Sequence, residues 1–179
     1  MKKITLLFIL AFVAVSVNAQ NLKFGHINTT ELVSLMSDTD SAMVKLKAYQ
    51  TELEEEMEAM QVEYNNKLNT YQQKAATWTA AIKEAKETEL SEMVQRLQQF
   101  QTTAQQELGQ MNQTLMIPIY DKAKAAIDKI AKEKGLAFVL EMSTNPVIYY
   151  DEKISTDLLP LAKAALGVPA EKVAPTQIQ

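Results

Sequence analysis

Apolar residues recur along the middle of the chain in alternating steps of three and four. From Met43 this rhythm continues to Tyr64, and the next apolar residue, Leu68, then follows after a second successive step of four. Steps of three and four form the heptad repeat of helices that pack along a seam, and two successive fours are a stutter, which locally unwinds the supercoil. The pattern predicts a long coiled-coil helix with one stutter centred on Tyr64.

A second stretch repeats this pattern further along the chain. Its apolar positions are spaced 3, 4, 3, 4, 4, 3, 4 from Leu90 to Leu115, so its stutter is centred on Ala104. Two packed helices must unwind at the same level. If Tyr64 faces Ala104 in an antiparallel pair, the numbers of facing residues add to 168 and the turn lies near residue 84.

This register predicts a helical hairpin whose two helices meet along one apolar seam. The seam residues are Leu53, Met57, Met60, Tyr64, Leu68, Tyr71, Trp78, Leu90, Leu97, Phe100, Leu108, Met111 and Leu115. A continuous helix in a parallel coiled coil is the alternative, because "AAIKEAKETE" at the expected turn contains no Gly, Pro or Asn. We favour the hairpin because only the hairpin brings the flanking strands together.

The segment before the long helices has the composition of a strand followed by a short helix. Residues 22–28 ("LKFGHIN") favour a strand, and Thr29 or Thr30 with Glu31 can cap a short helix after it. Residues 37–41 offer a second capping point, and helix-favouring residues then continue to Lys134.

The segment after the long helices alternates strand and helix signals. Gly135 suits the left-handed residue that ends a helix, and Pro160 suits a first helical turn. The expected elements are a strand at 136–142, a turn at 143–146, a strand at 147–150 ("VIYY"), a helix at 158–166 that stops at Gly167, and a mobile tail at 168–179.

The predicted fold is therefore α+β, with a small β-body (residues 20–37 and 119–167) and a helical arm (38–118). Each arm helix would be about 45 residues and roughly 65 Å long. About 60 residues remain for the body, a marginal core for one chain, so other copies of the chain are expected to complete it. Residues expected to pack in the body and between subunits are Phe24, Ile27, Phe138, Leu140, Ile148 and Tyr150.

The N-terminus has the pattern of a cleaved secretory signal. Lys2 and Lys3 precede a mostly apolar stretch, and small residues at 17–19 suit cleavage after Ala19. The apolar stretch is shorter than the roughly 20 residues that span a bilayer. Cleavage would leave 16 basic and 22 acidic residues, a net charge of −6. We expect a periplasmic protein, and the negative charge argues against a nucleic-acid partner.

The sequence offers little for catalysis. It has no cysteine, and its four glycines are too far apart for a phosphate-binding or dinucleotide-binding loop. The one histidine, His26, lies in a predicted strand without a second ligand for a metal site or a nucleophile partner. We therefore expect a protein that is not an enzyme and that uses no metal or cofactor.

With these elements in place, the sequence resembles the Skp/OmpH family of periplasmic chaperones over most of its mature length. The motifs that carry the resemblance are "PIYDKAKAAIDKIAKEKGLAFVLEM", "VIYYDEKISTDLLPLAKAAL" and "KFGHIN". The resemblance implies a homotrimer with an intersubunit β-barrel and three helical tentacles around a cavity. It also implies an ATP-independent holdase that shelters unfolded outer-membrane β-barrel proteins.

One departure from the family concerns charge. The best-studied relatives are strongly basic, whereas this chain carries "ELEEEMEAM", so a lipopolysaccharide or membrane-surface site is not carried over. The glutamates either form a solvated helix face or repel neighbouring arms and wrong partners.

Client-binding candidates are apolar residues that lie off the seam, namely Tyr49, Val62, Ile82, Val94 and Met116. Pro118 is either a hinge of the arm or a fixed bend. The alternative function is a structural coiled-coil adaptor or tether of the cell envelope.

Overall fold

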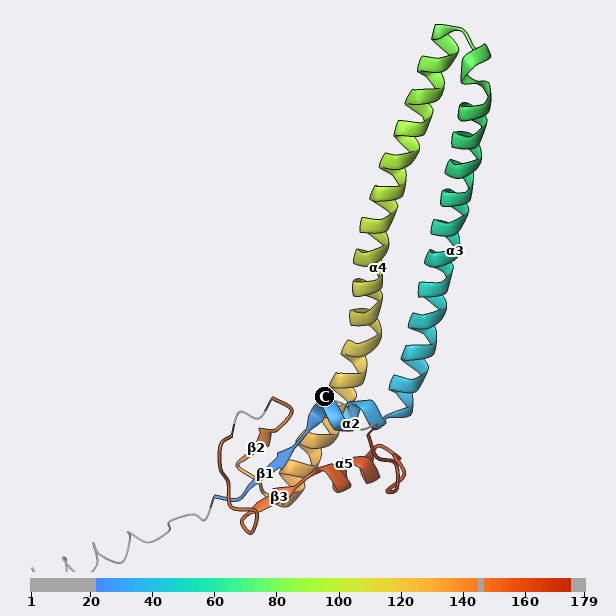
Figure 1. Cartoon of the computed structure of the whole chain (residues 1–179). Helices are drawn as coiled ribbons and strands as arrows, with labels where there is room; N and C mark the ends of the chain where they lie inside the picture. The colour runs from blue at the N-terminus through green and yellow to red at the C-terminus, as the bar shows by residue number, and fades with distance from the viewer. Residues whose placement is uncertain (1–21, 145–146, 175–179) are drawn as a thin grey trace, which may run out of the picture. The chain divides into compact units, whose positions relative to one another are not determined.

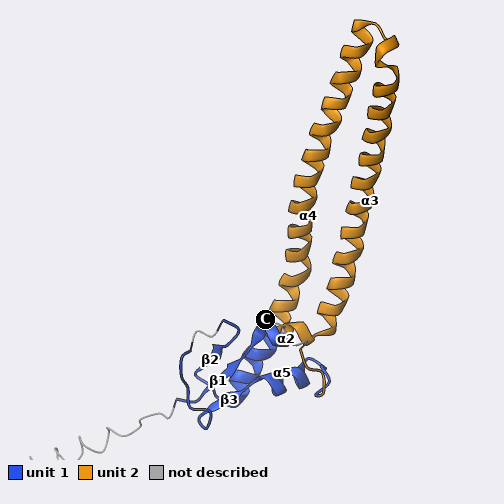
Figure 2. Ribbon diagram, in the orientation of Figure 1, with its two compact units in different colours: residues 1–32, 125–170 blue, residues 33–124, 171–179 orange. Residues whose placement is uncertain are grey.

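A computed structural model describes residues 22–144 and 147–174. The chain divides into two compact units, shown in Figure 2. One unit comprises residues 1–32 and 125–170, and we call its described part the body. The other comprises residues 33–124 and 171–179, and we call residues 33–124 the arm. The predicted signal peptide lies outside the described residues.

Two long helices form the arm and confirm the α+β class with a helical hairpin. Helix α3 spans Ser37–Lys74, a 3-10 turn (η1) spans Ala75–Thr77, and helix α4 spans Ala80–Lys134. The two helices run antiparallel, side by side, to a turn at the far end of the arm (Figure 1). The continuous-helix alternative is therefore wrong.

The turn lies at residues 75–79, and the prediction of a turn near residue 84 is wrong. Trp78 adopts an extended backbone (φ −88°, ψ 151°), which breaks the helix. The Thr79 hydroxyl then accepts a hydrogen bond from the Ile82 N–H at 3.4 Å, the pattern of a helix N-cap. Three residues with low helix propensity, Thr77 to Thr79, thus end one helix and start the next.

The predicted register of the two helices is also wrong, because the turn lies earlier in the chain than predicted. The hydroxyl of Tyr49 donates to the Glu107 carboxylate at 2.7 Å, and Lys122 pairs with Asp38 at 2.9 Å. The numbers of these pairs add to 156 and 160, not to 168. At this register Ala104 is level with Leu53, so the two stutters do not face each other.

The start of α3 also differs in detail from the sequence pattern. Ala42 is the buried residue there, 5% exposed, while Met43, from which the rhythm was counted, is 55% exposed. Met36 is the N-cap residue of α3 and makes no side-chain capping bond, so the predicted second capping point at residues 37–41 is wrong.

Three short parallel strands form the sheet of the body. Strand β1 (Phe24–Ile27) lies in the middle, between β2 (Phe138–Glu141) and β3 (Ser155–Asp157). The register pairs Phe24 with Phe138 on one side and with Ser155 on the other. A side chain at Gly25 would collide with Leu158, since an added Cβ would lie 2.3 Å from its Cδ1, and this explains the glycine. The largest buried side chains of the body are Leu32 and Leu158.

The segment after β2 corrects the prediction of a strand at "VIYY". Residues 147–150 form no strand, and Ile148 and Tyr149 are almost fully exposed. The Asp151 carboxylate accepts a hydrogen bond from the Lys153 N–H, and its carbonyl accepts one from the Ser155 N–H. This turn brings residues 155–157 alongside β1 instead. The predicted turn at residues 143–146 lies partly outside the described residues.

The short helices mostly follow the prediction. Helix α2 spans Thr29–Leu35, but its cap is Asn28, whose side-chain oxygen accepts from the Glu31 N–H at 3.0 Å. The expected cap at Thr29 or Thr30 is therefore wrong. Helix α5 spans Leu159–Ala165 with Pro160 in its first turn. Gly135 adopts the expected positive φ of 65°, and Gly167, at which the last helix was expected to stop, has a φ of 70°.

The segment after α5 begins with packed residues, contrary to the prediction of a mobile tail from residue 168. Val168 is 7% exposed, and its N–H donates to the Lys163 carbonyl at 2.9 Å. The Lys163 ammonium in turn donates to the Ala170 carbonyl at 2.7 Å. Residues 168–170 therefore fold back on α5.

Candidate functional site: the helical arm

The apolar seam that joins α3 and α4 is only partly closed. All thirteen predicted seam residues are partly buried, and among arm residues of these two helices only a few, such as Met93 at 4% exposure, are buried. The residues between them along each helix are mostly exposed. Two helices alone cannot bury a broad apolar face. The arm therefore leaves parts of its apolar side chains accessible to solvent.

The five predicted client-binding residues do not form one patch. Val62, Ile82 and Val94 are 51%, 44% and 37% exposed, and by the observed register only Val62 and Val94 lie at nearly the same level. Tyr49 is half-buried and holds Glu107 across the helices. Met116 is also half-buried.

Sequence reasoning missed four exposed apolar residues near the other end of the arm. They are Met43, Val44, Ile117 and Tyr120, which are between 43% and 70% exposed. Ile117 and Tyr120 flank Pro118, which lies inside α4. Val44, Ile117 and Tyr120 lie off the predicted seam, and this position is the sequence signal that could have identified them. Met43 was counted as part of the seam rhythm, so its exposure had no such signal.

Pro118 lines a cavity of about 480 Å³ together with Ser41 and Ala42 of α3. The predicted sum of 168 would place Pro118 opposite Gln50, and this position is wrong because the predicted register is wrong. The residue is exposed, and α4 continues through it without interruption.

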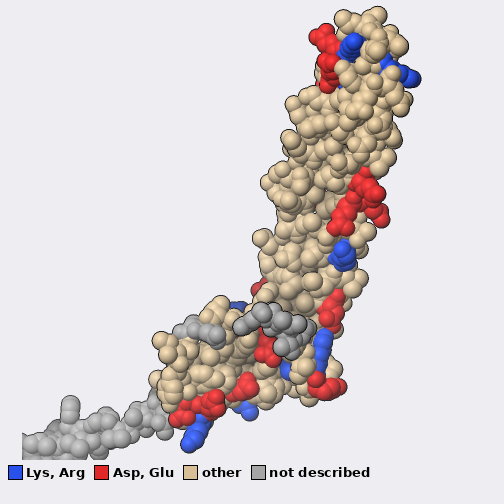
Figure 3. Space-filling view, in the orientation of Figure 1, with Lys and Arg blue, Asp and Glu red and all other residues tan. Residues whose placement is uncertain are grey.

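Charge is distributed unequally between the two helices. Glu52, Glu54, Glu55, Glu56 and Glu58 of α3 are all exposed. On α4, by contrast, Glu107 is the only charged residue from 97 to 120. Figure 3 shows acidic side chains gathered at separate levels of the arm, with long uncharged stretches between them.

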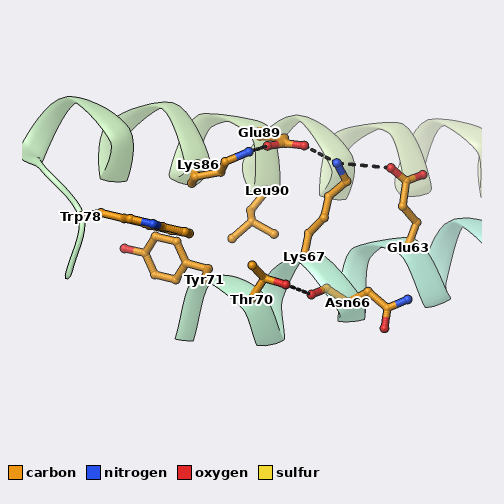
Figure 4. Close-up of a pocket in the computed structure, with 9 residues that line it drawn as sticks. All are labelled: Glu63, Asn66, Lys67, Thr70, Tyr71, Trp78, Lys86, Glu89 and Leu90. Atoms are coloured by element: carbon orange, nitrogen blue, oxygen red, sulfur yellow. Dashed lines mark hydrogen bonds and ion pairs between the residues drawn. The ribbon is translucent and has the colours of Figure 1, made fainter. Parts of the chain in front are cut away.

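Polar and aromatic side chains fasten the two helices next to the turn (Figure 4). Glu89 of α4 bridges Lys67 of α3 and Lys86, and the Lys67 ammonium also lies 3.5 Å from Glu63. The rings of Tyr71 and Trp78 meet edge to face, 5.9 Å between centroids. These groups line a small cavity of about 210 Å³.

The two lysines define the electrostatics of this cluster. Hydrogen bonds from Lys67 and then Lys86 lower the pKa of Glu89 to about 2. The hydrogen bond to Glu89 raises the pKa of Lys67. Tyr71 donates to Glu87, and this bond raises the pKa of Tyr71. The cluster is a polar fastening of the hairpin and has no group poised for proton transfer near neutral pH.

In the body, the six predicted packing residues have different surroundings. Ile27 is buried, and Phe24 stacks on Phe138 with 5.5 Å between ring centroids. Tyr150 lies against His26 at 4.8 Å, and the His26 Nδ1 is 2.7 Å from the Ser155 hydroxyl. Leu140 is half-buried, and Ile148 is fully exposed.

Among residues 22–144 and 147–174, no group of three His, Asp or Glu side chains is arranged to hold a metal ion. In the same part of the chain, no helix is long and apolar enough to cross a membrane.

The sequence profile of the outer membrane protein family called OmpH-like matches residues 23–166, which include both the arm and the body. The chain belongs to the OmpH-like family.

The structure of another OmpH-like protein supports this fold assignment. This protein of Caulobacter crescentus, assigned as an outer membrane chaperone, superposes with a TM-score of 0.68. The match covers 88% of the present chain and 94% of the other, at 15% sequence identity. A comparison with curated proteins gave no match. Membership of the OmpH-like family supports a chaperone role for the chain.

Proposed function

We propose that this OmpH-like chain is an ATP-independent periplasmic holdase. It binds unfolded outer-membrane β-barrel proteins between helical arms and prevents their aggregation during transit. The observation that carries this proposal is the family match across arm and body together. An arm with a half-open apolar seam suits the task, because a holdase needs many weak contacts on an adaptable surface.

The body supports the trimer that this function requires. Phe138, Ile148, Tyr149 and Ile154 are between 48% and 104% exposed. Both outer strands of the described sheet, β2 and β3, have a free edge. Exposed apolar residues beside free strand edges favour association. Three copies that join these edges would form the intersubunit barrel.

The remaining parts of the proposal concern export and movement. Residues 1–19 direct export and are removed after Ala19. Val62 and Val94 are the first candidates for client contact, because both are exposed and lie at nearly one level. Pro118 lets the arm swing with client size, or else fixes its direction.

The test uses residues 20–179, purified and examined for mass in solution and for the ability to keep an unfolded outer-membrane β-barrel protein soluble without ATP. A trimer that suppresses aggregation supports the proposal. A monomer, or a trimer without this activity, contradicts it and leaves an envelope tether as the better explanation.

A further inference from the structure

The middle of the arm contains a groove of about 600 Å³ between α3 and α4. Partly buried apolar residues form its floor, and they are Leu53, Met57, Phe100, Ala104 and Leu108. Exposed polar residues form its two rims, Glu54 and Glu58 on α3 and Gln101 and Gln105 on α4. The groove thus has an apolar floor, an acidic rim and an amide rim.

The groove exists because one residue of the seam is small. Ala104 contributes a single methyl group at the level of Leu53, whereas Phe100 and Leu108 on either side of it are large. Protein interiors are otherwise close-packed, so the missing volume at this position leaves accessible space over the neighbouring side chains. The same alanine occupies the centre of the second stutter, which has no stutter opposite it.

The acidic rim has no cation opposite it. The Glu54 carboxylate accepts a hydrogen bond from the neutral amide of Gln50 at 2.6 Å. Glu58 makes no ion pair with any residue that the structure describes. The polar residues of α4 that line the groove across from these glutamates, Gln101 and Gln105, are uncharged. The negative potential along this rim is available to a bound cation.

We propose that this groove binds segments of unfolded polypeptide in which a lysine or arginine adjoins an apolar residue. The apolar side chain covers Met57, Phe100 and Ala104, and the cation pairs with Glu54 or Glu58. The amides of Gln101 and Gln105 donate to and accept from the neutral backbone of the segment. This inference rests on the proposed holdase function and names the client segments that the arm selects.

The charge pattern favours this occupant over others. An acidic segment would meet the repulsion of the glutamates, and a second arm would bring its own glutamates to the same level. A segment with basic residues gains charge-assisted hydrogen bonds at the rim while it covers apolar surface.

The test measures binding of short fluorescent peptides to the mature chain by anisotropy at low ionic strength. Three peptides are compared. The first alternates lysine and leucine, the second has glutamate in place of each lysine, and the third has serine in place of each leucine. We expect the lysine and leucine peptide to bind best and to lose affinity as salt is added.

Two variants of the chain remove one feature of the groove each. Glu54→Gln with Glu58→Gln should weaken binding of the lysine and leucine peptide roughly fivefold, as expected for two exposed ion pairs. Ala104→Leu fills the groove and should weaken binding of the same peptide roughly tenfold or more, because the apolar side chain of the peptide loses its site. The matched controls are Glu55→Gln with Glu56→Gln, which do not line the groove, and Ala85→Leu on the exposed face of α4.

Equal loss of affinity in the glutamate controls would overturn the proposal, since general charge would then explain the binding. Unchanged affinity in Ala104→Leu would also overturn it. A change of mass in solution without a change of peptide affinity would identify the groove as a contact between copies and would exclude the peptide site. If the groove variants bind peptide as the unmodified chain does while aggregation of a full client is still suppressed, the inference fails and the holdase function stands.

Discussion

The body and the arm hide their apolar side chains to different degrees. In the body, Leu32 and Leu158 are 0% exposed within a sheet of only three short strands. In the arm, the seam runs the length of α3, yet nearly all of its residues are half-exposed. Stability in the body therefore depends on a few complete contacts, and stability along the seam of the arm on many incomplete ones. The difference explains how one chain can combine a specific fold with an adaptable surface.

The largest effect is expected from truncating a complete contact in the body. Leu158→Ala leaves a cavity beside Gly25 and should lower the free energy of unfolding by about 2 to 5 kcal/mol. Denaturant titration at fixed protein concentration measures this change. Val44→Ala, at a 70% exposed position of the arm, is the control and should change stability by less than about 0.5 kcal/mol. Similar losses in both variants would contradict the comparison.

Within the arm, truncation of Met93 should have a larger effect than truncation of Leu97. Met93 is 4% exposed, so Met93→Ala should cost about 2 kcal/mol, near the lower end for a core residue. Leu97 is only half-buried, so Leu97→Ala should cost about half as much. Trp78, the single tryptophan, lies in the arm, so its fluorescence reports the unfolding of the arm. Equal losses of stability in Met93→Ala and Leu97→Ala would show that the two side chains contribute equally to the seam despite their different exposure.

The turn provides the next smaller effect. Thr79→Ala removes the N-cap of α4 and should cost about 1 kcal/mol. Thr88→Ala is the matched control, because its hydroxyl donates to the Glu84 carbonyl within the helix and an alanine there is a better helix former. If the control were as destabilising as Thr79→Ala, capping at Thr79 would not define the turn.

The sequence allowed the seam residues to be proposed but gave the wrong register. Seam positions recur every three or four residues, so a shift of one helix by about three turns again places apolar residues opposite apolar residues. Polar pairs such as Tyr49 with Glu107 distinguish between these registers. Such pairs join residues far apart in the chain and leave no local pattern. The local signal for the turn was the low helix propensity of Thr77 to Thr79. It was easy to overlook because the residues on both sides of it favour helix.

In the body, local signals identified helix ends better than strands. Gly135 and Gly167 specify a backbone conformation by themselves, which is why both helix ends were predicted. "VIYY" has strand composition but cannot pair, because the turn at Asp151 brings residue 155 and its neighbours to β1. Pairing in a sheet depends on distant partners, and composition alone does not contain them.

The smallest predicted effect concerns the polar fastening beside the turn, where the arm depends on exposed charges. The pKa of Glu89 is about 2 in the folded arm, below its ordinary value of 4.5. Its contribution to stability is therefore present above pH 4.5 and is lost as the pH falls toward 2. Glu89→Gln should unfold more easily than the unmodified chain near neutral pH, and this difference should vanish toward pH 2.

Measurement of the denaturation midpoint against pH, in low and high salt, checks this expectation. The difference should be small and should shrink in high salt, because the groups are exposed and screened. Glu92→Gln, an exposed change on the same helix, should leave the pH dependence unchanged. If Glu89→Gln kept the full acid dependence of the unmodified chain, carboxylates elsewhere would control it. The Glu89 cluster would then contribute little to the stability of the arm, and the apolar seam and the other polar pairs, such as Tyr49 with Glu107, would hold the two helices together.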